Sequence, residues 1–402
     1  MARVVLLGDP SLPGFARHRL QLFTRALSGH TLCVLDVRDA RLEREFRSFN
    51  AEIVVTAGSY APTRAALALV GEQPLWVDLP GDPFADAQAY GGGDPLVAAD
   101  AAAVFVPALA RGDAFSTISE RSRWALLGQL GLLGRVARCP PEQALAEVIP
   151  VAWDFGVPPT EQPRVARPRP LRVLLAGSFN TWFDDETLLA GLLLAMQEAP
   201  VEVCVLGGPV PGHAETGWRR FCEGARQSSY HHAFSFHPWV PDEEISALTQ
   251  RCHVGVSLDR PGLEPELGSR TRLLFYLHQG LSLVATTRSE LAASLADAGV
   301  LHAVAPGSPE ALASALLGPL PVPDRSSVAE QYSPARVVLP LQRWAAAPRR
   351  APPSPNADLL QAALIERDRL QAELGAIRSA PLFRFLSGAH AGLRRLRAGR
   401  SD

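Results

Sequence analysis

The sequence predicts an α/β protein built from two doubly wound domains of parallel strands and helices. Short apolar runs alternate with helical segments through about the first 140 residues, and the same rhythm restarts at Leu171. Eight prolines lie between Cys139 and Pro170, so an extended connection divides the chain there. A chain of 402 residues also exceeds what a single core usually takes.

The apolar runs mark the expected strands. Val4 to Leu7 is wholly apolar and ends in glycine and proline punctuation before a helix at 15–27. Further strands are expected at 31–37, 51–56, 74–78 and 110–119, with an amphipathic helix at 120–133. In the second half, strands are expected at 171–176, 201–206, 233–239, 254–258, 281–285 and 300–304, and helices at 309–317 and 333–344.

The composition is ordinary for a soluble α/β enzyme. Apolar residues make up 47% and charged residues 20%, and the net charge is −2, so nucleic acid is not expected as a partner. The sequence contains no lysine, so a bound phosphate would have to be held by arginine. The five cysteines are scattered without C-x-x-C spacing, which argues against a disulfide framework or a zinc site.

The sequence gives no sign of export or of a membrane span. Met1 to Arg3 leads directly into the first strand, without an apolar leader or a small-residue cleavage site. No run approaches the roughly 18 to 20 apolar residues that cross a bilayer. We therefore expect a cytoplasmic protein.

The most informative stretch is 261–285. Glu266 is expected on a loop punctuated by glycine and proline, followed by Arg270-Thr271-Arg272, an apolar helix, Gly280 and a strand. In a parallel sheet this order places the helix N-terminus at the carboxyl edge, where free N–H groups and two arginines favour a phosphate. The alternative is that the arginines are solvated or paired with Glu266.

Two loops of the first half also follow strands. The loop that contains Gly14 lies between a strand and a helix but lacks the G-x-G-x-x-G pattern of dinucleotide sites. Asp78 ends the strand at 74–78 and Asp82 lies just past it, where a carboxylate can face a ligand. Asp82 could equally cap the helix that follows Pro83.

The C-terminal tail differs in kind from the rest. Residues 358–378 carry apolar side chains at coiled-coil-like spacing, interrupted by Arg367, which suggests self-association. Residues 381–400 mix arginines with Phe383 and Phe385, as in helices that lie on a membrane surface at the inner face. A disordered or self-associating tail is the alternative. The adjacent His231 and His232, with His237, lack metal-ligand spacing, so no metal site is expected.

Five segments together resemble a known enzyme family. They are DLPGDP at 78–83, the segment 113–135, GSFNTWFDDETLL at 177–189, FHPWVPD at 236–242, and the stretch from Glu266 to Gly280. The chain resembles the retaining glycosyltransferases of the GT-B fold, specifically the family 4 enzymes of bacterial surface-polysaccharide clusters, over roughly residues 1–345.

The resemblance implies two Rossmann-like domains that face each other across a cleft. These are an acceptor-side domain at 1–150 and a nucleotide-sugar domain at 171–330, joined by a linker at 151–170. A helix at 331–346 would cross back to the first domain, and 347–402 would be a linker and helical tail. The donor would be a nucleoside-diphosphate sugar and the acceptor a glycan or a lipid-linked sugar, without a metal or cofactor.

The same resemblance assigns roles to residues. Glu266 would hold the sugar, Arg270 and Arg272 would stabilise the leaving diphosphate, and Asp78 or Asp82 would orient the acceptor. The donor would also be bound by Gly14, Gly177, Ser178, Asn180, Trp182, Leu267, Gly268, Ser269 and Thr271.

Two positions depart from the family pattern. Phe275 stands where the family has a second carboxylate near the ribose, and Asp184 stands where a lysine is common. A phenylalanine cannot accept hydrogen bonds from ribose hydroxyls. Two further hypotheses therefore stay open, namely a catalytically degenerate scaffold protein of polysaccharide assembly and, as the weaker one, a sugar-nucleotide epimerase.

Overall fold

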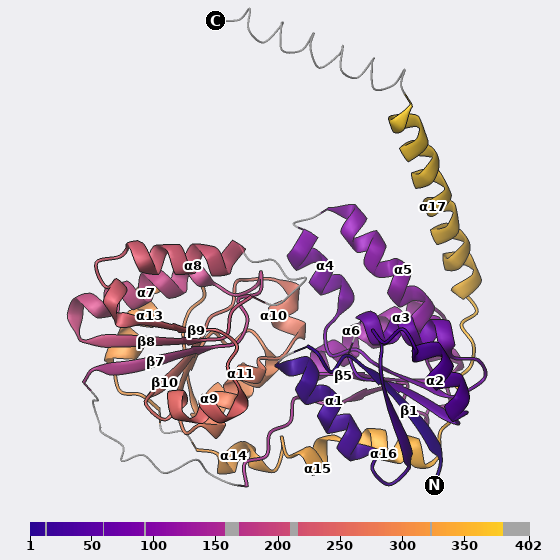
Figure 1. Cartoon of the computed structure of the whole chain (residues 1–402), viewed down its shortest axis with the longest axis horizontal. Coiled ribbons are helices and arrows are strands. Elements are labelled where there is room, and N and C mark those ends of the chain that lie inside the picture. The colour runs from indigo at the N-terminus through magenta and orange to yellow at the C-terminus, as the bar shows by residue number, and fades with distance from the viewer. Residues whose placement is uncertain are drawn as a thin grey trace, which may run out of the picture.

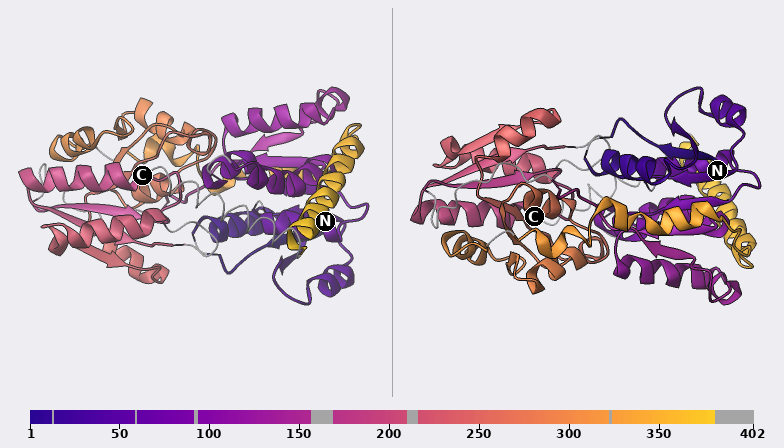
Figure 2. Two further views of the ribbon diagram at one scale, coloured as in Figure 1. Left: turned by 90° about the horizontal axis from the view of Figure 1, so that it is seen from above. Right: turned by 90° about the horizontal axis from the view of Figure 1, so that it is seen from below.

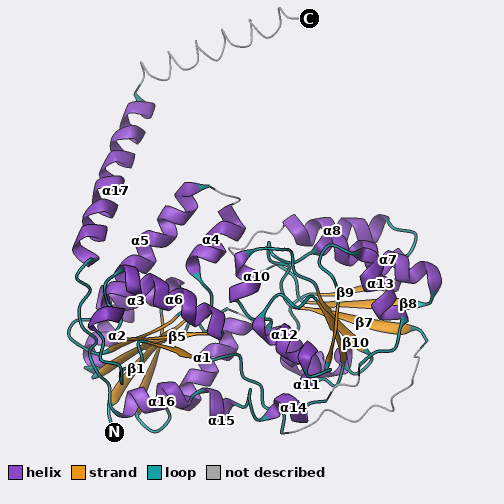
Figure 3. Ribbon diagram, turned by 180° about the vertical axis from the view of Figure 1, so that it is seen from behind, coloured by secondary structure: helices purple, strands orange, loops and turns teal. Residues whose placement is uncertain are grey.

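The protein consists of two lobes that lie side by side, each built around a six-stranded parallel sheet (Figure 1). The computed structural model describes residues 1–402 except 13, 59, 92–93, 157–168, 210–215, 322–323 and 381–402. Strands occupy the centre of each lobe and helices surround them (Figure 3). The expected α/β fold class of two doubly wound domains is confirmed.

The sheet of the N-terminal domain has the order β2-β1-β3-β4-β5-β6. Val4 and Leu6 of β1 lie in one apolar cluster, and Val5 and Leu7 lie in the cluster on the other face. A strand that is covered on both faces needs apolar side chains at every position, which is why this run has no polar alternation. The strands are β1 (Arg3–Gly8), β2 (Thr31–Asp36), β3 (Ile53–Thr56), β4 (Leu75–Asp78), β5 (Ala114–Thr117) and β6 (Ala146–Val148). The helices are α1 (Phe15–Ala26), α2 (Leu42–Phe49), α3 (Tyr60–Leu69), α4 (Pro83–Gly91), α5 (Pro95–Arg111) and α6 (Glu120–Leu132).

The C-terminal domain repeats this plan in the order β12-β11-β10-β7-β8-β9. Its helices lie on both sides of the strands when the molecule is seen from above and below (Figure 2). The strands are β7 (Leu171–Ala176), β8 (Val201–Leu206), β9 (Phe234–His237), β10 (Val254–Ser257), β11 (Ser282–Ala285) and β12 (Leu301–Ala303). The helices are α7 (Asp185–Glu198), α8 (Thr216–Gln227), α9 (Asp242–Thr249), α10 (Leu263–Leu267), α11 (Thr271–His278), α12 (Glu290–Asp297) and α13 (Pro309–Leu317).

After the second sheet the chain returns to the N-terminal domain. Helices α14 (Ser326–Ala329), α15 (Pro334–Val337) and α16 (Leu339–Ala346) run beneath the two lobes (Figure 1). Val337 and Leu341 belong to the apolar core of the first domain, and the ring centroid of Trp344 lies 5.3 Å from that of Trp76. The last described helix, α17 (Ala357–Ser379), projects away from this domain (Figure 1).

Several elements differ from the sequence expectation. The strand expected at 110–119 is shorter, because α5 continues to Arg111 and β5 begins at Ala114. The strand β6 was not expected at all, since its three residues are too few to form a recognisable apolar run. The helix expected at 333–344 is divided at Val338, with Pro340 in the first turn of α16. Within the described residues, no helix is both long and apolar enough to cross a membrane.

Candidate functional site

The loops that follow β7, β8 and β10 meet at one edge of the second sheet. Gly177 follows β7 with a φ of 96°, and Gly207 follows β8 with a φ of 114°. A Cβ atom on Gly207 would lie 2.8 Å from the carbonyl oxygen of Gly177, so only glycine fits there. In open α/β sheets this carboxyl edge is where ligands bind.

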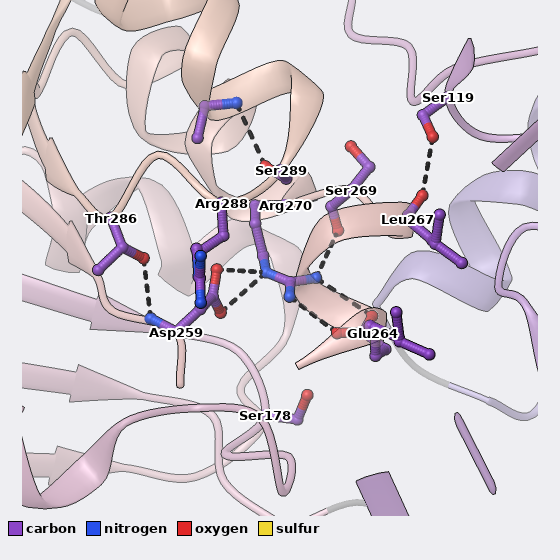
Figure 4. A network of polar contacts seen from close by, with 12 residues as sticks. Ser119, Ser178, Asp259, Glu264, Leu267, Ser269, Arg270, Thr286, Arg288 and Ser289 are labelled. Atoms are coloured by element: carbon purple, nitrogen blue, oxygen red, sulfur yellow. Dashed lines mark hydrogen bonds and ion pairs between the residues drawn. The ribbon is translucent and has the colours of Figure 1, made fainter. Parts of the chain in front are cut away.

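Arg270 lies just before α11 and is almost fully buried between two carboxylates (Figure 4). Its Nε atom donates to both oxygens of Asp259 at 2.9 and 2.8 Å. Its terminal nitrogens donate to Glu264 at 3.2 and 2.8 Å and to the carbonyl of Ser269 at 3.3 Å. Burial opposes the charge of Arg270, but the two carboxylates outweigh it and raise its pKa. The guanidinium is committed to Asp259 and Glu264, so its direct role is to fix α10 against β10 and α11.

Arg272 lies in the first turn of α11, is half-buried, and makes no ion pair within the described residues. One terminal nitrogen donates to the carbonyl of Ser178 at 2.8 Å, and the guanidinium lies 4.9 Å from the centre of the Phe183 ring. Burial lowers its pKa, yet arginine stays charged at neutral pH. A cation without an acid partner, at a helix N-terminus and beside a glycine loop, is suited to an anion.

Glu266 lies on the short helix α10, and not on the irregular loop that the sequence predicted. Its two oxygens contact Arg121 at 2.9 Å and Arg288 at 3.1 Å. Glu266 is therefore not the partner of Arg270 or Arg272 that the alternative hypothesis proposed, since its carboxylate pairs with two other arginines. Arg121 belongs to α6 of the N-terminal domain, so this carboxylate lies where the two domains meet.

The other residues expected around the donor lie close to the same edge. Leu267 accepts a 2.7 Å hydrogen bond at its carbonyl from the Ser119 hydroxyl of the other domain (Figure 4). Gly268 donates its N–H to the carbonyl of Glu264 at 2.7 Å, and Thr271 begins α11. The backbone of Asn180 accepts from the N–H of Phe183 at 2.9 Å.

Two of the expected residues face the other domain. The ring of Trp182 lies edge-on to that of Tyr90 from α4, with 5.6 Å between centroids. Gly14 has a φ of 62° at the start of α1, and a Cβ atom there would lie 4.0 Å from the ring of Trp239. Of the predicted donor residues, Leu267, Trp182 and Gly14 thus lie against the other domain in the described structure.

Asp78 and Asp82 take structural partners in the first domain. Asp78 is fully buried and receives two hydrogen bonds from Arg19, at 3.0 and 2.7 Å, and one from the Ser116 hydroxyl at 2.6 Å. Asp82 caps α4 by accepting from the N–H groups of Phe84 and Ala85, at 3.0 and 2.9 Å. Capping is therefore what the structure shows for Asp82, and Asp78 has no exposed surface to offer an acceptor.

The two side chains that depart from the family pattern have local structural roles. Phe275 packs against Trp153, with 5.8 Å between ring centroids, as part of an apolar cluster. Asp184 caps α7 by accepting from the N–H of Thr187 at 3.2 Å. Neither side chain can replace the charge of the residue that the family has there.

Four residues of this region were not found by sequence reasoning. Asp259 and Glu264 hold Arg270, Arg121 contacts Glu266, and Asp86 lies in the first turn of α4. Burial raises the pKa of Asp86 to about 7, and Glu264 and Asp82 add to this effect while Arg270 opposes it. Asp259 could have been noticed, because it lies at the carboxyl end of a buried strand as Asp78 does, but nothing local in the sequence pairs Arg121 with Glu266. No cluster of metal-ligating side chains occurs in the described part of the chain.

Comparison with solved structures identifies the architecture. The Anabaena protein HepE, crystallised with UDP and glucose, superposes with a TM-score of 0.62 at 12% identity, covering 86% of this chain and 100% of HepE. A glycosyltransferase from Rickettsia africae superposes with a TM-score of 0.60 at 12% identity, covering 87% of this chain and 99% of that glycosyltransferase. Sucrose-phosphate synthase from Thermosynechococcus elongatus superposes with a TM-score of 0.59 at 14% identity, covering 94% of this chain and 100% of the synthase.

The chain has the GT-B fold. At identities this low, the likeness shows the architecture and leaves the activity to be argued from the site. No protein family model matches the sequence, and no curated protein matches it either.

Proposed function

We propose that this GT-B protein is a glycosyltransferase that moves a sugar from a nucleoside-diphosphate sugar to a glycan or lipid-linked acceptor, with retention of configuration. The observation that carries the proposal is Arg272, a half-buried cation without an acid partner in the described structure. It stands at the N-terminus of α11, beside the loop of Gly177. UDP is bound by HepE, a protein of the same architecture.

In this proposal Arg272 stabilises the diphosphate as it leaves the sugar. The negative charge on the leaving oxygen grows as the glycosidic bond breaks, so a fixed cation there favours the transition state over the bound substrate. The free N–H groups at the start of α11 would add to this effect. Arg270 is a positioning residue in this mechanism, because its ion pairs with Asp259 and Glu264 hold α10 and α11 together.

The absence of lysine leaves arginine to supply the phosphate-binding charge. We propose that Arg272 meets this need without a metal ion. Glu266, half-exposed where the domains meet, is the candidate to accept hydrogen bonds from the sugar hydroxyls.

A second candidate function is a degenerate GT-B module that binds or scaffolds without turnover. Phe275 and Asp184 favour it, because they replace an acid and a cation of the family pattern with side chains that pack and cap. Helix α17 also fits a scaffold, since Leu370, Leu374 and Ile377 are about half-exposed on it and could mediate self-association. The membrane contact proposed for 381–400 concerns residues outside those described.

A panel of nucleotide sugars tests the two functions against each other. The enzyme should be stabilised against heat by at least one of them and should release nucleoside diphosphate when an acceptor glycan is present. Stabilisation without release across all acceptors would favour the scaffold. Failure of every nucleotide sugar to bind would refute the donor site itself.

A further inference from the structure

The N-terminus of α6, in the acceptor-side domain, contacts the candidate donor site of the other domain. Arg121 donates to Glu266 at 2.9 Å and to the carbonyl of Arg288 at 2.8 Å. Its backbone N–H donates to Glu290 at 3.1 Å, and the nearby Ser119 hydroxyl donates to the carbonyl of Leu267 at 2.7 Å. One turn of α6 therefore makes four hydrogen bonds to the second domain.

Glu266 is held from two sides by these contacts. One carboxylate oxygen faces Arg121 and the other faces Arg288, at 2.9 and 3.1 Å. The Glu266 side chain is 37% exposed, so the two ion pairs are partly screened and serve mainly to fix its orientation. A carboxylate has about four lone-pair sites, so two remain for the hydroxyl groups of a sugar after both arginines have bound.

We propose that Arg121 is a positioning residue for Glu266, supplied by the acceptor-side domain to the donor-sugar site of the other domain. The inference rests on the proposed function, in which Glu266 binds the sugar of the donor. Residues of both domains would then form the sugar subsite, whereas the diphosphate subsite at Arg272 is formed by the C-terminal domain alone. Contact with the sugar is then complete only when the two domains are together.

This arrangement predicts a difference between two ligands that share a diphosphate. Arg121→Ala should lower kcat/KM for the nucleotide sugar about 10-fold to 100-fold, because Glu266 loses one of its two fixed contacts. The affinity for the nucleoside diphosphate alone should change less than about twofold, since that ligand carries no sugar for Glu266 to hold. If Arg121 only held the two domains together, its loss would lower the affinity for both ligands by the same factor.

The experiment compares Arg121→Ala, Arg121→Lys and Glu266→Ala, with Arg123→Ala as the matched control. Arg123 lies on the same helix and pairs with Glu120 of its own domain. Arg121→Lys should restore part of the activity, because it returns the charge without the forked geometry. The double variant Arg121→Ala/Glu266→Ala should be no worse than Glu266→Ala, because both changes remove one interaction.

Three outcomes would overturn the inference. The first is an unchanged kcat/KM in Arg121→Ala, the second is an equal loss of affinity for the diphosphate and the nucleotide sugar, and the third is additive losses in the double variant. Each of them would leave the proposed function standing. A wild-type protein that binds diphosphate but no nucleotide sugar would overturn both together.

Discussion

Each sheet carries, at its carboxyl edge, a buried arginine that is neutralised by acids, and in the C-terminal domain a second, half-buried arginine lies beside it. In the N-terminal domain Arg19 and Asp78 form a fully buried pair at 2.7 Å. In the C-terminal domain Arg270 is matched in the same way by Asp259 and Glu264, and Arg272 adds a charge without a carboxylate partner in the described structure. What distinguishes the C-terminal edge is a partly buried cation without a carboxylate partner in the described structure, and we propose that this cation binds the diphosphate.

The comparison also separates arginines that are paired with buried acids from Arg272, which has no acid partner in the described structure. A buried ion pair holds its elements in place, and removing one partner leaves an uncompensated charge in a medium of low dielectric constant. A half-buried arginine without an acid leaves no such charge behind when it is removed. Mutation of Arg270 should therefore reduce stability far more than mutation of Arg272, although both belong to one Arg-Thr-Arg segment.

The largest effect on stability is expected for Arg270. Arg270→Met should lower the free energy of unfolding by about 3–5 kcal/mol, because Asp259 and Glu264 would be buried without their partner. Arg272→Met should cost less than about 1 kcal/mol, since it strands no carboxylate. Urea unfolding followed by circular dichroism measures both, and equal losses would abolish the distinction.

The next effect concerns activity. Arg272→Ala should lower kcat/KM for the nucleotide sugar by about two orders of magnitude, because the leaving diphosphate loses its cation. Arg219→Ala is the matched control, since that arginine is exposed on α8 of the same domain. Steady-state rates that fall equally in the two variants would show that general charge, and not this position, was responsible.

A smaller effect should depend on pH. The pKa of Asp86 is raised to about 7, so the folded protein keeps a proton that the unfolded chain releases near pH 4, and this contribution to stability is lost as the pH rises through 7. Asp86→Asn should therefore stabilise the protein by about 1–3 kcal/mol at pH 8 and by little at pH 4. Thermal unfolding at both values checks this, with Asp39→Asn as a control, because Arg41 lowers the pKa of that carboxyl to about 2. A gain that is the same at both pH values would contradict the assignment.

The smallest effects are expected at the two helix caps. Asp82→Ala in the first domain and Asp184→Ala in the second should each cost about 1 kcal/mol of stability, because each leaves the first N–H groups of a helix without an acceptor. Neither change should alter diphosphate affinity. A tenfold loss of diphosphate affinity in either variant would show that the substituted aspartate contributes to diphosphate binding.

Particular residues show how far the sequence could be interpreted. The strands around Val4 and Leu171 were predictable because a short, predominantly apolar run that ends in glycine is typical of a strand buried on both faces. The position of Arg272 followed from the same logic, since a strand, a turn and a helix fix where a helix N-terminus points. The fold class and the location of Arg272 at the start of α11 could therefore be predicted from local patterns.

The contact partners of the charged residues could not be predicted from the sequence. Arg270 meets Asp259 and Glu264, and Glu266 meets Arg121, which is 145 positions away. Which arginine is neutralised depends on how the segment between β10 and α11 folds on itself, where Arg270 finds acids 11 and 6 positions away, and on where distant segments such as α6 pack; no spacing rule encodes either. The sequence alone therefore located the charged residues but could not show that Arg270 is paired with acids and that Arg272 is not.

A calorimetric titration with nucleoside diphosphates tests the central claim most directly. UDP is the first ligand to try, because HepE was crystallised with it. Wild-type protein should bind at least one nucleoside diphosphate, and Arg272→Ala should weaken that binding about 10-fold to 100-fold while Arg219→Ala binds normally. Binding that is unchanged in Arg272→Ala would contradict the claim that the unpaired arginine of the C-terminal domain holds the diphosphate.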